Sequence, residues 1–351
     1  MFVILMYLSS GLFLGWSLGA NNAANFWGTA VGTRMVKFRT AAILCSILVI
    51  AGAVISGAGA SQTIGKLGGI NSLGGAFTVA LATAIISYLM TRSGIPISTS
   101  QAVIGGIIGW NIFTSSATDY SILAKIAMSW VFSPVLTATI SFIMFFVVKL
   151  ILDNGKWHML KIDSWTRKLL IIVGAFGSYS LGANNIGNVM GVFVQTSPFQ
   201  DINVFNLFTL SSVQQLFLLG GIAIAVGVIT YSKRVMSTVG TDIFKLSPVT
   251  ALIVVFAVSV TMFLFASVGL KTFLTSHGLP SFPLVPVSSS QAIVGAVIGI
   301  SLAKGGKNLQ FKMLFKVGAG WVITPIATAL LTLVLLFITQ NVFMMEVFHQ
   351  G

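Results

Sequence analysis

Long stretches of the chain consist almost entirely of apolar residues. Examples are the runs Ala41–Ala60, Ala251–Leu270 and Trp321–Phe337. A helix of about 18 or more apolar residues can cross the hydrocarbon core of a bilayer. A membrane β-barrel would instead show short segments that alternate between apolar and polar positions. The pattern therefore predicts an all-α polytopic membrane protein with about 10 to 12 membrane segments, half-helices included.

Asparagines interrupt the apolar pattern twice, in two nearly identical sequence motifs. Residues 19–25 read Gly-Ala-Asn-Asn-Ala-Ala-Asn, and residues 182–188 read Gly-Ala-Asn-Asn-Ile-Gly-Asn. An amide in hydrocarbon must find a polar partner. Hydrogen bonding between helices explains one or two such amides, but it explains six in duplicate less well. We interpret the two asparagine motifs as a binding site built twice, from Asn21, Asn22, Asn25, Asn184, Asn185 and Asn188.

A second duplicated motif is rich in hydroxyl groups. Pro96–Ala102 and Pro286–Ala292 each place a proline before a run of Ser or Thr and a Gln. Such a segment starts a helix, whose free N–H groups and positive dipole end attract anions. Capping of two ordinary helices is the simpler alternative, but duplication beside the asparagine motifs favours a site. The candidate ligands in these serine motifs are Ser98, Thr99, Ser100, Gln101, Ser288, Ser289, Ser290 and Gln291.

The order of the motifs divides the chain into two similar halves. We predict a first membrane repeat at 1–151, a basic cytoplasmic linker at 152–166 and a second membrane repeat at 167–345. The pair Trp130 and Pro134 recurs as Trp321 and Pro325, and we interpret these residues as packing or interfacial tryptophans and helix kinks.

The spacing of the motifs differs between the halves. The asparagine motif recurs 163 residues later, whereas Val31–Thr33 recurs 208 residues later as Val239–Thr241. The shift of 45 residues predicts an added helix near 203–231. Two similar halves are typical of transporters with inverted repeats, in which broken or re-entrant helices meet near the membrane midplane.

Charge indicates the orientation of the chain. The sequence has 19 Lys and Arg against six Asp and Glu, a net charge of +13. The basic residues are spread over connections between apolar segments, so topology explains them better than nucleic-acid binding does. We predict that these connections are cytoplasmic and that both termini are extracellular, in a multi-pass protein of the cell membrane. The basic connections are 34–39, 149–168, 233–245 and 304–316.

The apolar segments offer no catalytic constellation. The three histidines, His158, His277 and His349, fall in predicted loops or at the end of the chain. No acid, base, nucleophile or metal cluster is visible in the core, so the sequence predicts neither an enzyme nor a bound cofactor.

The paired asparagine and serine motifs, with the Val-Gly-Thr segment, resemble the inorganic phosphate transporter (Pit) family, which includes related sulfate permeases. The resemblance covers nearly the whole chain. It implies an inverted-repeat fold, a homodimer and uptake of phosphate coupled to sodium or protons. It also implies that the fourteen motif residues bind substrate, with a candidate sodium site near Asn22 and Asn185.

The chain departs from the family pattern in both duplicated motifs, and the change in the asparagine motif is the consequential one. The family commonly has Asp where Asn22 and Asn185 stand, and Thr-His where Ser100-Gln101 and Ser290-Gln291 stand. An amide binds sodium more weakly than a carboxylate, carries no coupling proton and is a weaker acceptor for the P–OH group of phosphate. We therefore predict a secondary active transporter of a tetrahedral oxyanion, with phosphate first. A sulfate permease and an uncoupled anion channel or facilitator are the alternatives.

Overall fold

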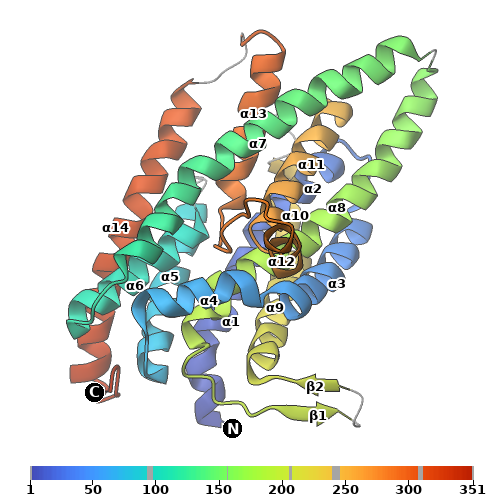
Figure 1. The fold of residues 1–351 in the computed structure, drawn as a ribbon. Coiled ribbons are helices and arrows are strands. Elements are labelled where there is room, and N and C mark those ends of the chain that lie inside the picture. The colour runs from blue at the N-terminus through green and yellow to red at the C-terminus, as the bar shows by residue number, and fades with distance from the viewer. Residues whose placement is uncertain are drawn as a thin grey trace.

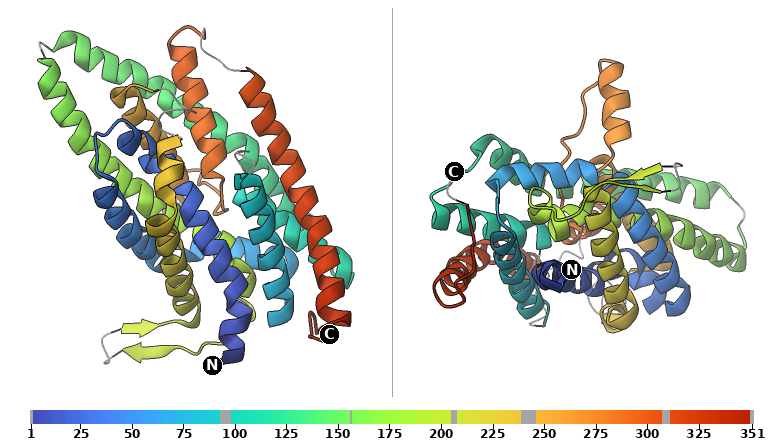
Figure 2. Two further views of the ribbon diagram at one scale, coloured as in Figure 1. Left: turned by 180° about the vertical axis from the view of Figure 1, so that it is seen from behind. Right: turned by 90° about the horizontal axis from the view of Figure 1, so that it is seen from below.

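The computed structural model describes residues 2–92, 98–155, 157–204, 208–238, 246–306 and 311–349. It is a bundle of helices, many of them long and steeply tilted (Figures 1 and 2). Within the described residues, seven helices are long and apolar enough to cross a membrane, and an eighth span is a bent pair. The predicted all-α polytopic fold, with a broken or re-entrant segment, is therefore confirmed.

The first half of the chain contains seven helices within the described residues. These are α1 (Phe2–Asn22), α2 (Ala24–Gly32), α3 (Phe38–Ser56), α4 (Ala58–Gly68), α5 (Leu73–Arg92), α6 (Thr99–Thr114) and α7 (Tyr120–Asn154).

The second half begins with one long helix and a small hairpin. Its elements are α8 (Met159–Met190), the short 3-10 helix η1 (Gly191–Phe193), β1 (Ile202–Val204), β2 (Phe208–Leu210), α9 (Ser212–Thr230), α10 (Ser232–Thr238), α11 (Pro248–Leu264), α12 (Val268–Ser276), α13 (Ser289–Ala303) and α14 (Phe311–Asn341). The two strands are antiparallel, with Asn203 opposite Thr209.

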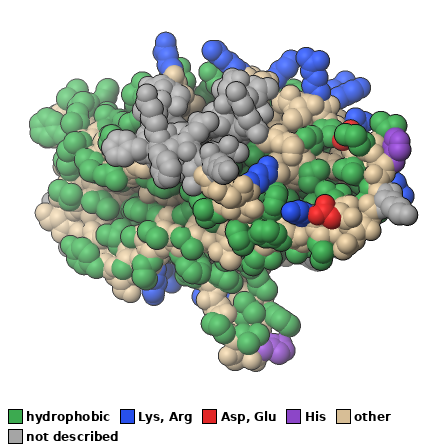
Figure 3. Space-filling model, turned by 90° about the horizontal axis from the view of Figure 1, so that it is seen from above, with side chains coloured by type: hydrophobic (Ala, Val, Ile, Leu, Met, Phe, Trp, Pro, Cys, Tyr) green, Lys and Arg blue, Asp and Glu red, His purple; other side chains and the backbone are tan. Residues whose placement is uncertain are grey.

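The two ends of the bundle differ in character. Both chain termini and the hairpin lie at one end, and the α7–α8 connection lies at the other (Figures 1 and 2). Figure 3 looks onto the latter end, where Lys and Arg side chains project along the rim. Two contacts join basic residues of this end to neighbouring helices: Lys233 lies 6.0 Å from the Phe38 ring, and Lys304 lies 5.9 Å from the Phe145 ring.

Two helices begin inside the bundle rather than at its ends. Ser98 and Ser288 have extended backbones, with φ −103° and ψ 105° and with φ −86° and ψ 116°, and α6 and α13 begin directly after them. The far end of α6 reaches the terminal end of the bundle, where Trp110 Nε1 donates to the Val347 carbonyl at 3.3 Å. The far end of α13 reaches Phe145 at the basic end. The two helices thus run in opposite directions from interior starts.

Glycines bring helices of different halves into backbone contact. A Cβ at Gly105 of α6 would overlap the carbonyl oxygen of Pro325 in α14, and a Cβ at Gly295 of α13 would overlap that of Pro134 in α7. A second matched pair occurs elsewhere, because Gly19 of α1 meets the Ile224 carbonyl and Gly182 of α8 meets the Val49 carbonyl. Close approach through small residues is the usual packing mode of membrane helices.

Much of the predicted linker at 152–166 is helical. Helix α7 continues to Asn154 and α8 begins at Met159, where the His158 side chain caps it by accepting from Leu160 N. The reason is length: α7 has 35 residues, which span about 52 Å at 1.5 Å per residue. That exceeds the roughly 30 Å hydrocarbon core, so basic residues are carried on helix ends rather than on a long loop.

The apolar run Ala251–Leu270 is not one straight helix. Helix α11 ends at Leu264 and α12 begins at Val268, with a bend of 69° between them. Ser267 starts the second segment, since its hydroxyl accepts from Leu270 N at 3.1 Å. Phe265 at the bend packs against Phe132 and Phe282. Because this residue is apolar, the hydrophobic pattern does not reveal the break.

The glycine contacts can be tested by adding one methyl group. Gly295→Ala should lower the free energy of unfolding of the purified protein by about 1–3 kcal/mol, because α13 and α7 must separate to accommodate the added methyl group. Differential scanning fluorimetry in detergent would measure the change. Gly269→Ala in α12 is the control, since a Cβ there meets nothing within 4 Å. A helix normally gains stability from Gly→Ala, so a stabilised Gly295→Ala protein would contradict the packing.

Candidate functional site

The asparagine motif of each half contacts the serine motif of the other half. Asn25 of α2 donates from Nδ2 to the Ser289 hydroxyl at 2.9 Å, and Asn188 of α8 donates to the Ser100 hydroxyl at 2.8 Å. Ser100 in turn donates to the Val287 carbonyl at 3.4 Å, which joins the start of α6 to the segment before α13. All four motifs therefore meet in one region of the bundle.

Asn184 acts as a clamp on the segment that leads into α13. Its side-chain oxygen accepts from Val287 N at 2.8 Å, and Nδ2 donates to the carbonyls of Val285 at 3.2 Å and Met262 at 3.5 Å. The side chain is fully buried. Both ends of this amide are thus occupied by backbone partners, and two of its bonds hold the segment before α13. These backbone partners carry no sequence signal, because only the fold brings them to Asn184.

Asn21, the matching residue of the first half, contacts a different helix. Its Nδ2 lies 3.5 Å from the Thr91 hydroxyl near the end of α5. Asn21 and Asn25 lie on different helices, because a turn at Ala23 separates α1 from α2. Ala23 keeps helical dihedrals, φ −57° and ψ −29°, so the two helices still form one apolar span. Pro96 and Val239–Thr241 lie outside the described residues.

Ser98 and Ser288 are N-caps. The hydroxyl of Ser98 accepts from Gln101 N, and the hydroxyl of Ser288 accepts from Gln291 N, both at 3.3 Å. This is the capping interpretation of the serine motifs, and it accounts for one residue in each. The cap uses the hydroxyl as an acceptor and leaves its O–H as a donor.

A set of polar groups in the same region is left without partners. The hydroxyls of Thr99 and Ser290 and the amide of Asn22 make no side-chain hydrogen bond to any described residue, although all three side chains are buried. Asn185 accepts from Asn188 at 2.9 Å but leaves its own Nδ2 buried and unpartnered. The first backbone N–H groups of α6 and α13 also lie in this region, and a helix cannot satisfy them internally. The region is therefore rich in neutral donors.

Carboxylates lie elsewhere within the described part of the chain. Asp119 caps α7, Asp201 accepts from Ser212 N at 2.7 Å near the hairpin, and Glu346 pairs with His349 at the terminal end. No group of three or more His, Cys, Asp or Glu residues that could hold a metal occurs among the described residues. Unpartnered buried acceptors do occur at the site, namely the side-chain oxygens of Asn188, Gln101 and Gln291.

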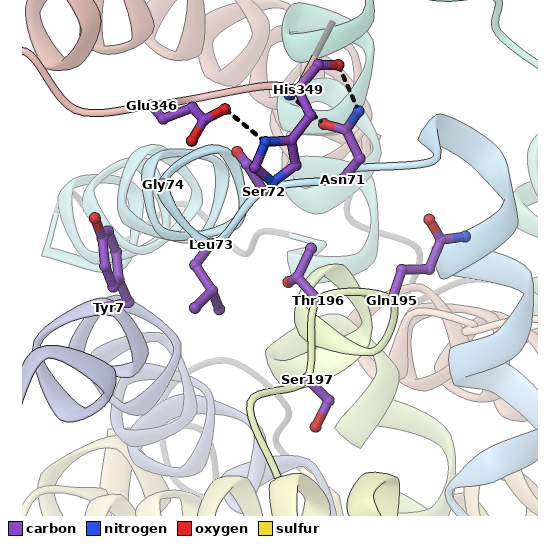
Figure 4. A pocket seen from close by; sticks show the side chains of 10 residues that line it. All are labelled: Tyr7, Asn71, Ser72, Leu73, Gly74, Gln195, Thr196, Ser197, Glu346 and His349. Carbon is purple, nitrogen blue, oxygen red and sulfur yellow. Dashed lines mark hydrogen bonds and ion pairs between the residues drawn. The ribbon is translucent and has the colours of Figure 1, made fainter. Parts of the chain in front are cut away.

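A cavity of about 440 Å³ lies apart from this site, at the terminal end of the bundle (Figure 4). The C-terminal tail forms one wall, because Asn71 donates to the His349 carbonyl at 2.9 Å and accepts from His349 N at 3.1 Å. The sequence pattern does not predict this cavity, because the cavity forms only when the C-terminal tail folds back over the turn before α5. None of the predicted site residues lines it. Its walls are Tyr7, Asn71, Ser72, Leu73, Gly74, Gln195, Thr196, Ser197, Glu346 and His349.

Known proteins are similar to this chain in both sequence and fold. The model of the phosphate transporter family matches residues 18–332 and 279–350. A "Putative phosphate permease" of Methanocaldococcus jannaschii is 30% identical over 310 residues, which cover 88% of this chain and 89% of the relative. The "Sulfate permease CysP" of Bacillus subtilis is 28% identical over 325 residues, covering 90% and 82%.

One solved structure, described as "The sodium-dependent phosphate transporter", superposes with a TM-score of 0.78 at 23% identity, covering 97% of this chain and 99% of that one. The fold and the family match define a multi-pass membrane transporter rather than an enzyme. The chain belongs to the phosphate transporter family.

The division between caps and free hydroxyls generates a prediction. Thr99→Val and Ser290→Ala remove hydroxyls that have no partner in the described part of the chain, so the free energy of unfolding should change by less than about 0.5 kcal/mol. Phosphate or sulfate affinity should fall by about 3- to 10-fold for each. Ser98→Ala and Ser288→Ala should instead cost about 1 kcal/mol of stability through the lost caps. Thermal unfolding and radiolabelled anion binding on the same samples separate the two effects. Equal loss of stability in both sets would contradict the assignment.

Proposed function

We propose that the protein is a secondary active transporter that takes up a tetrahedral inorganic oxyanion, with phosphate as the first candidate. The observation that carries the proposal is the meeting of two interior helix starts, α6 and α13, each contacted by an asparagine of the opposite half. Hydroxyls, amides and free backbone N–H groups surround this meeting point, and a tetrahedral oxyanion accepts hydrogen bonds on every side.

The charge of the site supports coupling to a cation. Each helix N-terminus contributes the equivalent of about half a positive charge, so the starts of α6 and α13 together supply about one. A dianion such as hydrogen phosphate or sulfate then needs one more positive charge to be neutral in the membrane. Sodium near Asn22 and Asn185 would supply it, and the unpartnered side-chain oxygen of Asn188 beside Asn185 is a suitable ligand. A proton is the alternative coupling ion.

The helix contacts support an inverted-repeat architecture. The close approach of α6 to α14 matches that of α13 to α7, and the approach of α1 to α9 matches that of α8 to α3. We infer that 1–151 and 167–345 are two inverted repeats, and that rocking of one packed unit against the other alternates access to the site. In this arrangement α9 is the counterpart of α3, so the second half differs from the first by the β1–β2 hairpin and α12 rather than by an added helix at 203–231.

Topology and assembly follow from the same reasoning. Basic connections favour the cytoplasmic side, which puts the terminal end of the bundle and the cavity of Figure 4 outside the cell. The homodimer is proposed from the resemblance to the family. Light scattering of the purified protein in detergent would test it.

Sulfate is the second candidate, because the donors at the site are not accompanied by a carboxylate among the described residues. Sulfate carries no proton near neutral pH and is satisfied by donors alone. Hydrogen phosphate has a P–OH group that also needs an acceptor. The lack of a carboxylate therefore favours sulfate, whereas the buried amide oxygens at the site can accept from phosphate.

Uptake into proteoliposomes tests the proposal. We expect radiolabelled phosphate to accumulate above its external concentration when an inward sodium or proton gradient is imposed, with unlabelled sulfate as competitor. Abolition by an ionophore that collapses only one gradient would identify the coupling ion. Equilibration without accumulation would indicate a channel or facilitator, and sulfate uptake without phosphate uptake would make the protein a sulfate permease.

Restoring an acid at the site should change the choice of anion. Asn185→Asp replaces the unpartnered Nδ2 with a carboxylate oxygen, which accepts from P–OH and repels sulfate. The ratio of phosphate to sulfate uptake should rise by about tenfold or more, equivalent to about 1.4 kcal/mol. Asn341→Asp adds the same charge at the exposed end of α14 and should leave the ratio unchanged. An unchanged ratio in Asn185→Asp would place the anion elsewhere.

A further inference from the structure

The cavity at the terminal end and the candidate anion site lie on one continuous segment of the chain (Figure 4). Asn188 of α8 belongs to the anion site, where it donates to Ser100, and Gln195 and Thr196 line the cavity just after η1. The step from residue 188 to residue 195 covers roughly 10 Å at the rise of a helix. The two polar regions are therefore close neighbours along the bundle.

An apolar layer fills the interval between these two regions. Every residue from 189 to 194 is apolar or glycine. Ile64 of α4 packs on this segment, because a Cβ at Gly191 would lie 2.9 Å from its side chain. A charged oxyanion cannot cross such a layer without losing its hydrogen bonds. The side chains that the segment contributes are all 3% exposed or less, namely Val189, Met190, Val192 and Phe193.

Phe193 sits in a notch of α1 at the centre of this layer. A Cβ at Gly11 would lie 2.7 Å from Cε2 of Phe193 and 3.3 Å from Sδ of Met190, so glycine leaves the space that the aromatic ring occupies. The Phe193 side chain is fully buried. Tyr7, one helical turn before Gly11, lines the cavity. The notch therefore lies directly beneath the cavity floor.

The backbone changes character at the same point. Helix α8 ends at Met190, whose dihedrals of φ −117° and ψ −4° depart from those of an α-helix, and η1 carries Phe193. A 3-10 turn has poorer hydrogen-bond geometry than an α-helix and occurs in short pieces. Rearranging this one turn moves the Phe193 ring, while Asn188 stays on the regular part of α8.

We propose that the cavity is the outer vestibule of the anion path and that Phe193, seated against Gly11, is the gate between the vestibule and the anion site. The gate is closed when the ring fills the notch, and a change in η1 opens it. The entering ligand is the same tetrahedral oxyanion, to which the unpartnered hydroxyl of Thr196 offers a neutral donor. This inference rests on the proposed function, because a gate presumes transport through the site.

Thiol labelling of intact cells tests the two compartments. The one cysteine of the chain, Cys45, is buried, so an introduced cysteine gives the signal. Thr196→Cys places a thiol in the cavity, and Thr99→Cys places one at the anion site. A membrane-impermeant thiol reagent added outside should label Thr99→Cys about tenfold more slowly than Thr196→Cys, because only molecules with an open gate react at the inner position. Faster labelling of Thr99→Cys from outside would overturn the vestibule.

One added methyl group should unseat the gate. Gly11→Ala overlaps the Phe193 ring, so it should raise the labelling rate of Thr99→Cys from outside by about tenfold through a larger open fraction. Gly65→Ala in α4 is the matched control, since a Cβ there meets only the Gly191 carbonyl oxygen at 3.7 Å. Both changes should leave the labelling of Thr196→Cys as it is.

Phe193→Ala removes the ring without adding volume, so it tests the gate even if Gly11→Ala does not fold. Thermal unfolding of the same samples identifies the folded variants. An unchanged labelling rate of Thr99→Cys in the folded variants would overturn the gate.

The labelling experiment does not depend on anion transport. If the gate variants expose Thr99→Cys but the wild-type protein takes up neither phosphate nor sulfate in proteoliposomes, the proposed function fails while the gate stands. If the wild-type protein accumulates one of these anions and the gate variants leave the labelling of Thr99→Cys unchanged, the gate fails alone.

Discussion

The arrangement of this protein depends on the need to pair polar side chains inside an apolar bundle. A buried amide or hydroxyl without a hydrogen-bond partner costs about 1–3 kcal/mol of stability. Apolar side chains cannot serve as that partner. Asn25 and Asn188 meet this need across the boundary between the halves, with Ser289 and Ser100 as partners. Each half therefore completes the polar region of the other, and the site exists only when the two halves pack together.

Helix packing makes this pairing possible. Hydroxyl-bearing first turns reach the interior because α6 and α13 start there, and Gly105 and Gly295 allow the supporting helices to approach closely. Asn184 holds the extended segment before α13 by two hydrogen bonds, to Val287 and Val285, and contacts Met262 of α11 by a third. The polar groups left over are then few and fixed in place, which is the preorganisation that a selective binding site requires.

The chemistry of the site is that of neutral donors and helix dipoles. Lysine and arginine would bind an anion more tightly, but a transporter must also release it on the other side. In the proposed mechanism, a site worth about one positive charge binds a dianion best when a cation accompanies it. The presence of Asn at 22 and 185 removes the strongest acceptors from this site. Among the described residues, the buried acceptors that remain there include the amide oxygens of Asn188, Gln101 and Gln291.

The sequence determined the class of protein, the family and the residues that gather at the site, because apolar length and duplicated motifs are local and survive without coordinates. Which role each motif residue takes was decided only by tertiary structure. Asn184 and Asn185 are neighbours with the same side chain, yet one clamps Val287 and the other keeps a free Nδ2. Likewise, Ser98 caps a helix, while the hydroxyl of Thr99 beside it has no hydrogen-bond partner among the described residues. The bend after Leu264 and the helical ends of the 152–166 segment also needed the fold. Partners distant in the chain choose among equivalent donors, and no local pattern records that choice.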